Sequence, residues 1–73
     1  MSEKREKFVS LAEKRVTRTI KDIRLIGNLS NKNNYSYEEK DVRKIISTLE
    51  DEVKTLKARF AADDVKSEAV FKL

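Results

Sequence analysis

Charged side chains supply almost all of the chemistry that this 73-residue sequence can carry. Asp, Glu, Lys and Arg make up 41% of the residues, whereas cysteine and histidine are absent. Without a thiol or an imidazole, neither a Cys–His nor a Ser–His pair can activate a nucleophile. The commonest zinc ligands are missing for the same reason. We therefore expect a protein that is not an enzyme and that uses no cofactor or metal.

An acidic cluster, Glu50-Asp51-Glu52, has the residue types of a cation site. Neighbouring residues on a helix point about 100° apart, so these three carboxylates do not converge if the segment is helical. We interpret the cluster as part of a solvated helix face.

Basic residues are concentrated in the first half of the chain. Residues 1–34 hold nine Lys and Arg against four Asp and Glu, whereas residues 35–73 hold eight against nine. Such a basic face is suited to the phosphates of a nucleic acid or to an acidic protein, although an ordinary solvated helix face is the commoner explanation. Its candidate residues are Lys7, Lys14, Arg18, Lys21 and Arg24.

The element that carries the basic face is a helix over about residues 3–26. Its apolar residues recur at steps of three and four, which is typical of one face of an α-helix. They are Val9, Ala12, Val16, Ile20, Ile23 and Ile26. Gly27, the only glycine, follows directly and predicts a helix end in the left-handed conformation.

A loop over residues 27–36 is predicted by its asparagines, since Asn readily adopts turn geometry. Loops held by rigid elements often bind partners, and tyrosine is enriched at interface hot spots. The candidate partner-binding residues are Asn31, Asn33, Asn34, Tyr35 and Tyr37. The alternative is a simple hairpin loop whose tyrosines cover the end of the core, and the sequence leaves both interpretations open.

A second helix is predicted over about residues 37–60, with Ser36 and Glu39 as a capping box. Its apolar residues alternate steps of four and three in a heptad pattern. They form the candidate dimer seam Val42, Ile46, Leu49, Val53, Leu56 and Phe60. The same seam would also suit packing against the first helix. The tail over residues 61–73 fits a short third helix, a continuation of the second, or a frayed end.

The length of the chain favours a partner subunit. A domain of this size buries only about 60% of the surface that its unfolded chain exposes, so it usually needs a disulfide, a metal or a second chain. We therefore expect a single all-α domain over residues 1–73, an antiparallel two-helix hairpin with an optional short C-terminal helix, which forms a homodimer with a four-helix arrangement. No apolar run follows residues 1–7 that would serve as a signal peptide or membrane span, so we expect a cytoplasmic protein without a membrane partner.

The stretch Ile23-Arg24-Leu25-Ile26-Gly27-Asn28-Leu29-Ser30-Asn31, followed by Asn34-Tyr35-Ser36-Tyr37, forms a distinctive signature. It resembles a group of small bacterial helical-hairpin proteins that share an IRxIGNLSN…NYxY pattern, over roughly Lys14 to Phe60 of this chain. The resemblance implies an independently folding hairpin and no particular activity.

The function that these features favour is a protein–protein interaction or regulatory module that occupies a partner's surface. One alternative is an accessory protein that binds nucleic acid without sequence preference through the basic face. Another is an inhibitor from a mobile element that blocks a nucleic-acid enzyme. Its support is a likeness of size and style, without a motif match, to phage and plasmid inhibitors of host systems, anti-CRISPR proteins included.

Overall fold

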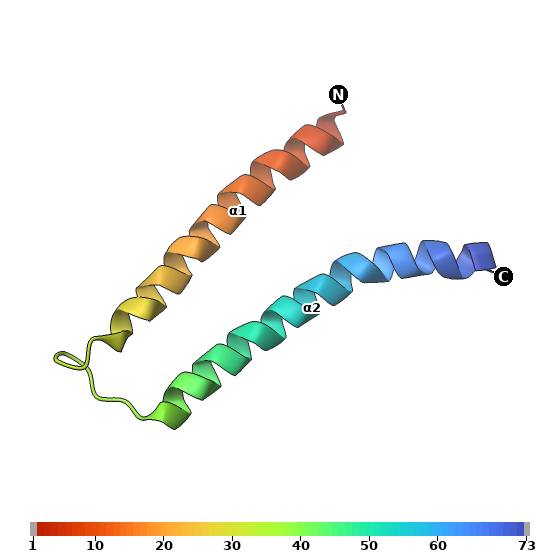
Figure 1. Cartoon of the computed structure of the whole chain (residues 1–73). Helices are drawn as coiled ribbons and strands as arrows, with labels where there is room; N and C mark the ends of the chain where they lie inside the picture. The colour runs from red at the N-terminus through yellow and green to blue at the C-terminus, as the bar shows by residue number, and fades with distance from the viewer. Residues whose placement is uncertain (1, 73) are drawn as a thin grey trace. The chain divides into compact units, whose positions relative to one another are not determined.

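The computed structural model describes the backbone of residues 2–72 and the side chains of residues 2–62. These residues form helix α1 (Glu3–Gly27), a short 3₁₀ helix η1 (Asn28–Ser30) and helix α2 (Glu39–Lys72) (Figure 1). No strand occurs within the described backbone. The predicted all-α class with two principal helices is confirmed.

Helix α1 begins at a serine cap that the sequence reading overlooked. Ser2 has an extended backbone, and its Oγ accepts a hydrogen bond from the backbone N–H of Arg5 at 3.2 Å. The Ser2 carbonyl accepts from the N–H of Glu6 at 3.1 Å. Glu3 and Glu6 add negative charge beside the positive end of the helix dipole. The first turn is therefore stabilised by both hydrogen bonding and charge.

The end of α1 differs from the predicted left-handed glycine. Gly27 has φ −59° and ψ −30°, which is right-handed helical geometry, and Asn28 continues with φ −65° and ψ −17°. The N–H of Asn28 donates to the carbonyl of Arg24. Because the chain tightens into η1 rather than reversing, the last carbonyls of α1 find partners without a positive φ. The prediction for Gly27 is wrong for that reason.

One asparagine organises the connection that follows η1. The Asn31 carbonyl accepts hydrogen bonds from the N–H groups of Asn34 at 3.1 Å and Tyr35 at 3.0 Å. Its side-chain Oδ1 accepts from the N–H of Asn33 at 3.0 Å. An asparagine that bonds the backbone two residues ahead forms an Asx turn, which is the local geometry that the asparagine-rich composition predicted.

Helix α2 starts later than the sequence predicted. The N–H of Glu38 donates to Oδ2 of Asp41 at 2.8 Å, and the Glu38 carbonyl accepts from the N–H groups of Asp41 and Val42 at 3.0 and 3.4 Å. The Asp41 carboxylate thus makes the reciprocal hydrogen bond of a capping box, by accepting from the backbone N–H of Glu38. The predicted pair of Ser36 and Glu39 is wrong, because the Asp41 carboxylate secures the first turn two residues further on.

The tail continues the second helix. Helix α2 runs to Lys72 without a break, so neither a separate short helix nor a stop near residue 60 is formed. The absence of proline and glycine after residue 27 explains why nothing interrupts it. The side chains of residues 63–73 lie outside the described part of the chain.

The chain divides into two units, Met1–Ser36 with α1 and η1, and Tyr37–Leu73 with α2. Each unit is built on a single α-helix, and one helix cannot bury its own apolar face. Accordingly, none of the side chains described between residues 2 and 62 is buried. Neither helix, over the residues described, is apolar and long enough to cross a membrane.

Candidate interaction surfaces

The apolar stripe of α1 is exposed along most of its length. We define it as the six residues at helical spacing, which at 3.6 residues per turn cover about 120° of the helix surface. Val9 and Ala12 are half-buried, whereas Val16 keeps 57% and Ile23 49% of its surface exposed. The complete stripe is Val9, Ala12, Val16, Ile20, Ile23 and Ile26.

The predicted dimer seam lies on α2 as a narrower strip. At 3.6 residues per turn its six residues fall within about 80° of the helix surface. Leu49 is half-buried, but Val53 keeps 54% and Phe60 60% of its surface exposed. Val42, Ile46 and Leu56 are exposed too, so the seam offers a continuous apolar strip. Ile45, which the sequence reading left out, borders this strip and is 38% exposed.

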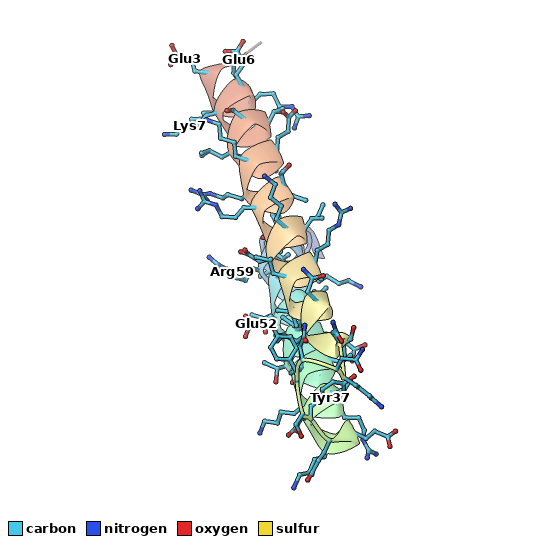
Figure 2. All side chains as sticks on the ribbon, turned by 90° about the vertical axis from the view of Figure 1, so that its left-hand side faces the viewer. Glu3, Glu6, Lys7, Tyr37, Glu52 and Arg59 are labelled. Atoms are coloured by element: carbon cyan, nitrogen blue, oxygen red, sulfur yellow. The ribbon has the colours of Figure 1, made fainter. Side chains whose placement is uncertain are left out.

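Both edges of the seam carry charges of both signs. In heptad terms one edge, the g row, contains Glu52 and Arg59, which project from the same side of α2 in Figure 2. The opposite edge, the e row, contains Arg43, Glu50 and Lys57. None of these five residues forms an ion pair with another described side chain. Lys40 and Glu38 form an ion pair at 3.3 Å, and both are too exposed for it to add much stability.

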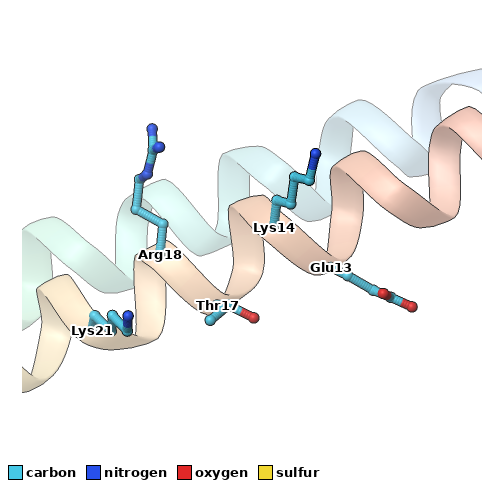
Figure 3. A pocket seen from close by; sticks show the side chains of 5 residues that line it. All are labelled: Glu13, Lys14, Thr17, Arg18 and Lys21. Carbon is cyan, nitrogen blue, oxygen red and sulfur yellow. The ribbon is translucent and has the colours of Figure 1, made fainter.

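The basic face lies on α1 and contains a shallow hollow. Lys14, Arg18 and Lys21 line this hollow together with Glu13 and Thr17 (Figure 3). Lys14 and Arg18 extend from the same edge of the helix, and Glu13 points away from them. Because none of the three cations forms an ion pair within the described part of the chain, their charge is available to a ligand.

The remaining two residues of the predicted basic face lie at its margins. Lys7 stands one heptad before Lys14 in the sequence and so lies near the same line along the helix. Arg24 lies about 120° around the helix from Arg18 at 3.6 residues per turn. The structure therefore gathers Lys14, Arg18 and Lys21 into one cluster and leaves Arg24 outside it.

The predicted loop surface is divided between the two units. Asn31, Asn33, Asn34 and Tyr35 belong to the first, and Tyr37 belongs to the second. The asparagines are occupied with the turn itself, through the oxygens of Asn31 and the N–H groups of the other two. Tyr35 keeps 49% of its surface exposed, whereas Tyr37 is half-buried. For Asn31, whose side chain bonds within the turn, this geometry favours the structural interpretation. Asn33 and Asn34 contribute only backbone N–H groups to these bonds, so the binding role of their side chains stays a prediction.

The structure shows two local contacts on α1 that the sequence did not predict. The guanidinium carbon of Arg5 lies 5.9 Å from the centre of the Phe8 ring, within the range of a cation–π contact. Thr19 Oγ1 donates to the Arg15 carbonyl at 2.9 Å, which satisfies a hydroxyl that borders the apolar stripe. The sequence signal for the first contact was an arginine three residues before an aromatic residue. The signal for the second was a threonine within a helical pattern.

The acidic cluster Glu50-Asp51-Glu52 lies on α2, where its members point in successive directions. Among the residues described, no three acidic side chains lie close enough together to hold a metal ion. The cluster therefore contributes single charges to different faces of α2, with Glu50 and Glu52 at the two edges of the seam.

No protein-family model matches this chain, and no significantly similar protein is found among the curated proteins or the solved structures. The resemblance to small bacterial hairpin proteins thus stays a prediction. The molecule offers four candidate interaction surfaces, namely the apolar stripe, the seam, the basic face and the loop.

Proposed function

We propose that this protein is a small, non-enzymatic interaction module that acts by occupying the surface of a partner. One observation carries the proposal: the apolar faces of both helices are exposed, and no side chain between residues 2 and 62 is buried. Covering a single Val, Leu, Ile or Phe side chain contributes about 1.5–3 kcal/mol. Eleven such side chains, together with Ala12, stand in the two regular rows and therefore represent a large stabilisation that only another surface can supply.

The mechanism that we propose is steric. A helix that presents an apolar row can lie in an apolar groove of a partner or pair with a partner helix, with anchors spaced at three and four residues. Occupation of the partner's surface then blocks or recruits that partner, and no bond needs to be made or broken. The charged residues beside each row determine which partners are accepted, because like charges in contact oppose binding.

Affinity capture with three baits tests this proposal. The first bait is the natural chain, the second carries Tyr35→Ser and Tyr37→Ser, and the third carries Arg18→Glu and Lys21→Glu. If the loop contributes to the partner surface, the tyrosine bait loses a stoichiometric partner protein that the charge bait retains. The proposal is wrong if no protein other than the chain itself is held by any folded bait.

A second candidate function is supported by the basic face. Lys14, Arg18 and Lys21 line one shallow hollow together with Glu13 and Thr17, and the three cations make no ion pair with a described side chain. Cations placed in this way suit the phosphates of a nucleic acid backbone, which attract them without regard to sequence. Retention on duplex DNA or on RNA should then fall steeply between about 50 and 200 mM salt. Retention that does not change with salt would exclude this function.

A further inference from the structure

We propose that two copies of α2 pair in parallel and in register through the seam, forming a two-stranded coiled coil. This inference rests on the proposed function, because it assigns a partner to one of the two exposed apolar faces. Two seams can be aligned in different ways, which differ in the apolar residues that they bury and in the charges that they bring together.

The width of the seam favours pairing of two helices. A strip restricted to the a and d positions of the heptad matches the narrow contact of a coiled coil, whereas packing in a larger core uses a strip wider than about 100°. The middle of the seam has Ile46 and Val53 at a and Leu49 and Leu56 at d. β-Branched residues at a with leucine at d favour two parallel strands.

In the parallel, in-register alignment, every apolar residue of the seam meets its own counterpart in the second copy. This alignment buries all six positions. It also places the g residue Glu52 beside the e residue Lys57 of the second copy, because g pairs with the e position five residues further on. By symmetry the contact occurs twice. Apolar burial and charge therefore agree in this alignment.

One antiparallel alignment also buries all six positions, by setting Val42 against Phe60 of the second copy. Antiparallel coils pair g with g and e with e, so this alignment sets Glu52 against Glu52 and Glu50 against Glu50. It further sets Arg43 beside Lys57 twice. Each of these contacts joins like charges, which disfavours the pairing.

A second antiparallel alignment, shifted by one heptad, corrects the charges but loses apolar contacts. It pairs Glu52 with Arg59 and Glu50 with Lys57. However, Val42 and Ile46 then fall opposite positions 67 and 63, which are serine and aspartate in the sequence. Of the three alignments, only the parallel one satisfies both the apolar seam and its charged edges.

Single cysteines test the direction of pairing, and the natural chain has none to interfere. Val42→Cys and Phe60→Cys mark the two ends of the seam, which lie about 27 Å apart along an α-helix. A disulfide requires Cα atoms within about 7 Å. In a glutathione buffer each variant alone should therefore form a cross-linked dimer. Cross-linking confined to a mixture of the two variants would establish an antiparallel pair, and a lack of any cross-link would overturn the seam dimer.

Charge exchange provides a second test that leaves the apolar seam intact. Glu52→Lys or Lys57→Glu turns both interchain contacts into like-charge contacts, so each should weaken the dimer roughly tenfold in sedimentation equilibrium. The double variant restores opposite charges in the parallel dimer and should recover the natural affinity within about twofold. A double variant that is as weak as the single variants overturns the parallel register.

These tests are separable from those of the proposed function. A chain that stays monomeric in both experiments but still captures a stoichiometric partner protein would overturn the coiled coil and keep the interaction module. A chain that forms the parallel dimer but captures no other protein would keep the coiled coil and contradict the occupation of a foreign surface.

Discussion

Helices α1 and α2 expose apolar rows of six residues each, yet the surroundings of the two rows differ. The stripe of α1 is broad, and the opposite side of that helix carries Lys14, Arg18 and Lys21 without ion-pair partners among the described side chains. The seam of α2 is narrow, and acidic and basic residues alternate along both of its edges. The apolar content of a helix therefore does not reveal its partner. The charges beside the row distinguish a surface that can pair with itself from one that suits a different ligand.

The largest effect is expected from a charge placed in the seam. Leu49→Asp removes a leucine from each copy of the proposed dimer, and burial of such a side chain contributes about 1.5–3 kcal/mol. The dimer should therefore weaken by roughly a hundredfold or more, with loss of helix signal in circular dichroism. Thr48→Asp is the matched control, because it adds the same charge one residue away, outside the seam. Equal behaviour of the two variants would show that the seam is not an interface.

The next effect tests whether affinity for DNA depends on the basic face of α1 or on the net charge of the protein. Arg18→Glu with Lys21→Glu should lower any affinity for duplex DNA about tenfold and reduce the salt slope by about two. As a control, Lys44→Glu with Lys54→Glu makes the same change in net charge on the side of α2 away from the seam. If that control weakens binding equally, attraction to DNA is a property of total charge and α1 has no special role.

A pair of serines compares the two helix starts. Ser2→Ala removes the side-chain acceptor of the Arg5 N–H and should destabilise α1 by about 1 kcal/mol. Ser36→Ala should leave thermal unfolding unchanged, because the Ser36 hydroxyl has no hydrogen-bond partner within the described residues. The reverse order in melting experiments would restore the sequence-based assignment of the cap to Ser36.

The smallest effect is a stabilisation at the end of α1. Gly27 has helical backbone angles, and a Cβ added there would meet no atom within 4 Å. Gly27→Ala should therefore raise the stability of α1 by about 0.5–1 kcal/mol, because alanine has less backbone entropy to lose than glycine when the helix forms. A fall in the melting temperature would mean that Gly27 adopts the left-handed conformation in solution.

The sequence predicted the two helices and their apolar rows because these features depend on many residues acting together. A periodic row is not changed by one unusual position, as Thr19 beside the stripe of α1 illustrates. The helix ends were predicted poorly, since each depends on one hydrogen bond for which several polar residues compete. Ser36 matched the usual pattern, but Asp41 reaches the Glu38 N–H.

Among the candidate sites too, features that follow from a periodic pattern were easier to predict than features that depend on single hydrogen bonds. The positions of the basic face and of the seam follow from helical periodicity, and both could be assigned before the structure. The contribution of each asparagine could not, because hydrogen bonds within a turn depend on backbone angles that the residue types do not determine. The use of Asn31 as the organiser of the connection emerged only from its contacts with residues 33–35.

The lack of any buried side chain between residues 2 and 62 has a consequence for the lifetime of the protein in the cell. Proteases cleave chains that open, and segments with few buried apolar contacts open most easily. A copy whose apolar rows are covered should therefore persist, and an uncovered copy should be degraded. The amount of the protein would then follow the amount of whatever covers it, so that its concentration is adjusted after synthesis without a dedicated regulator.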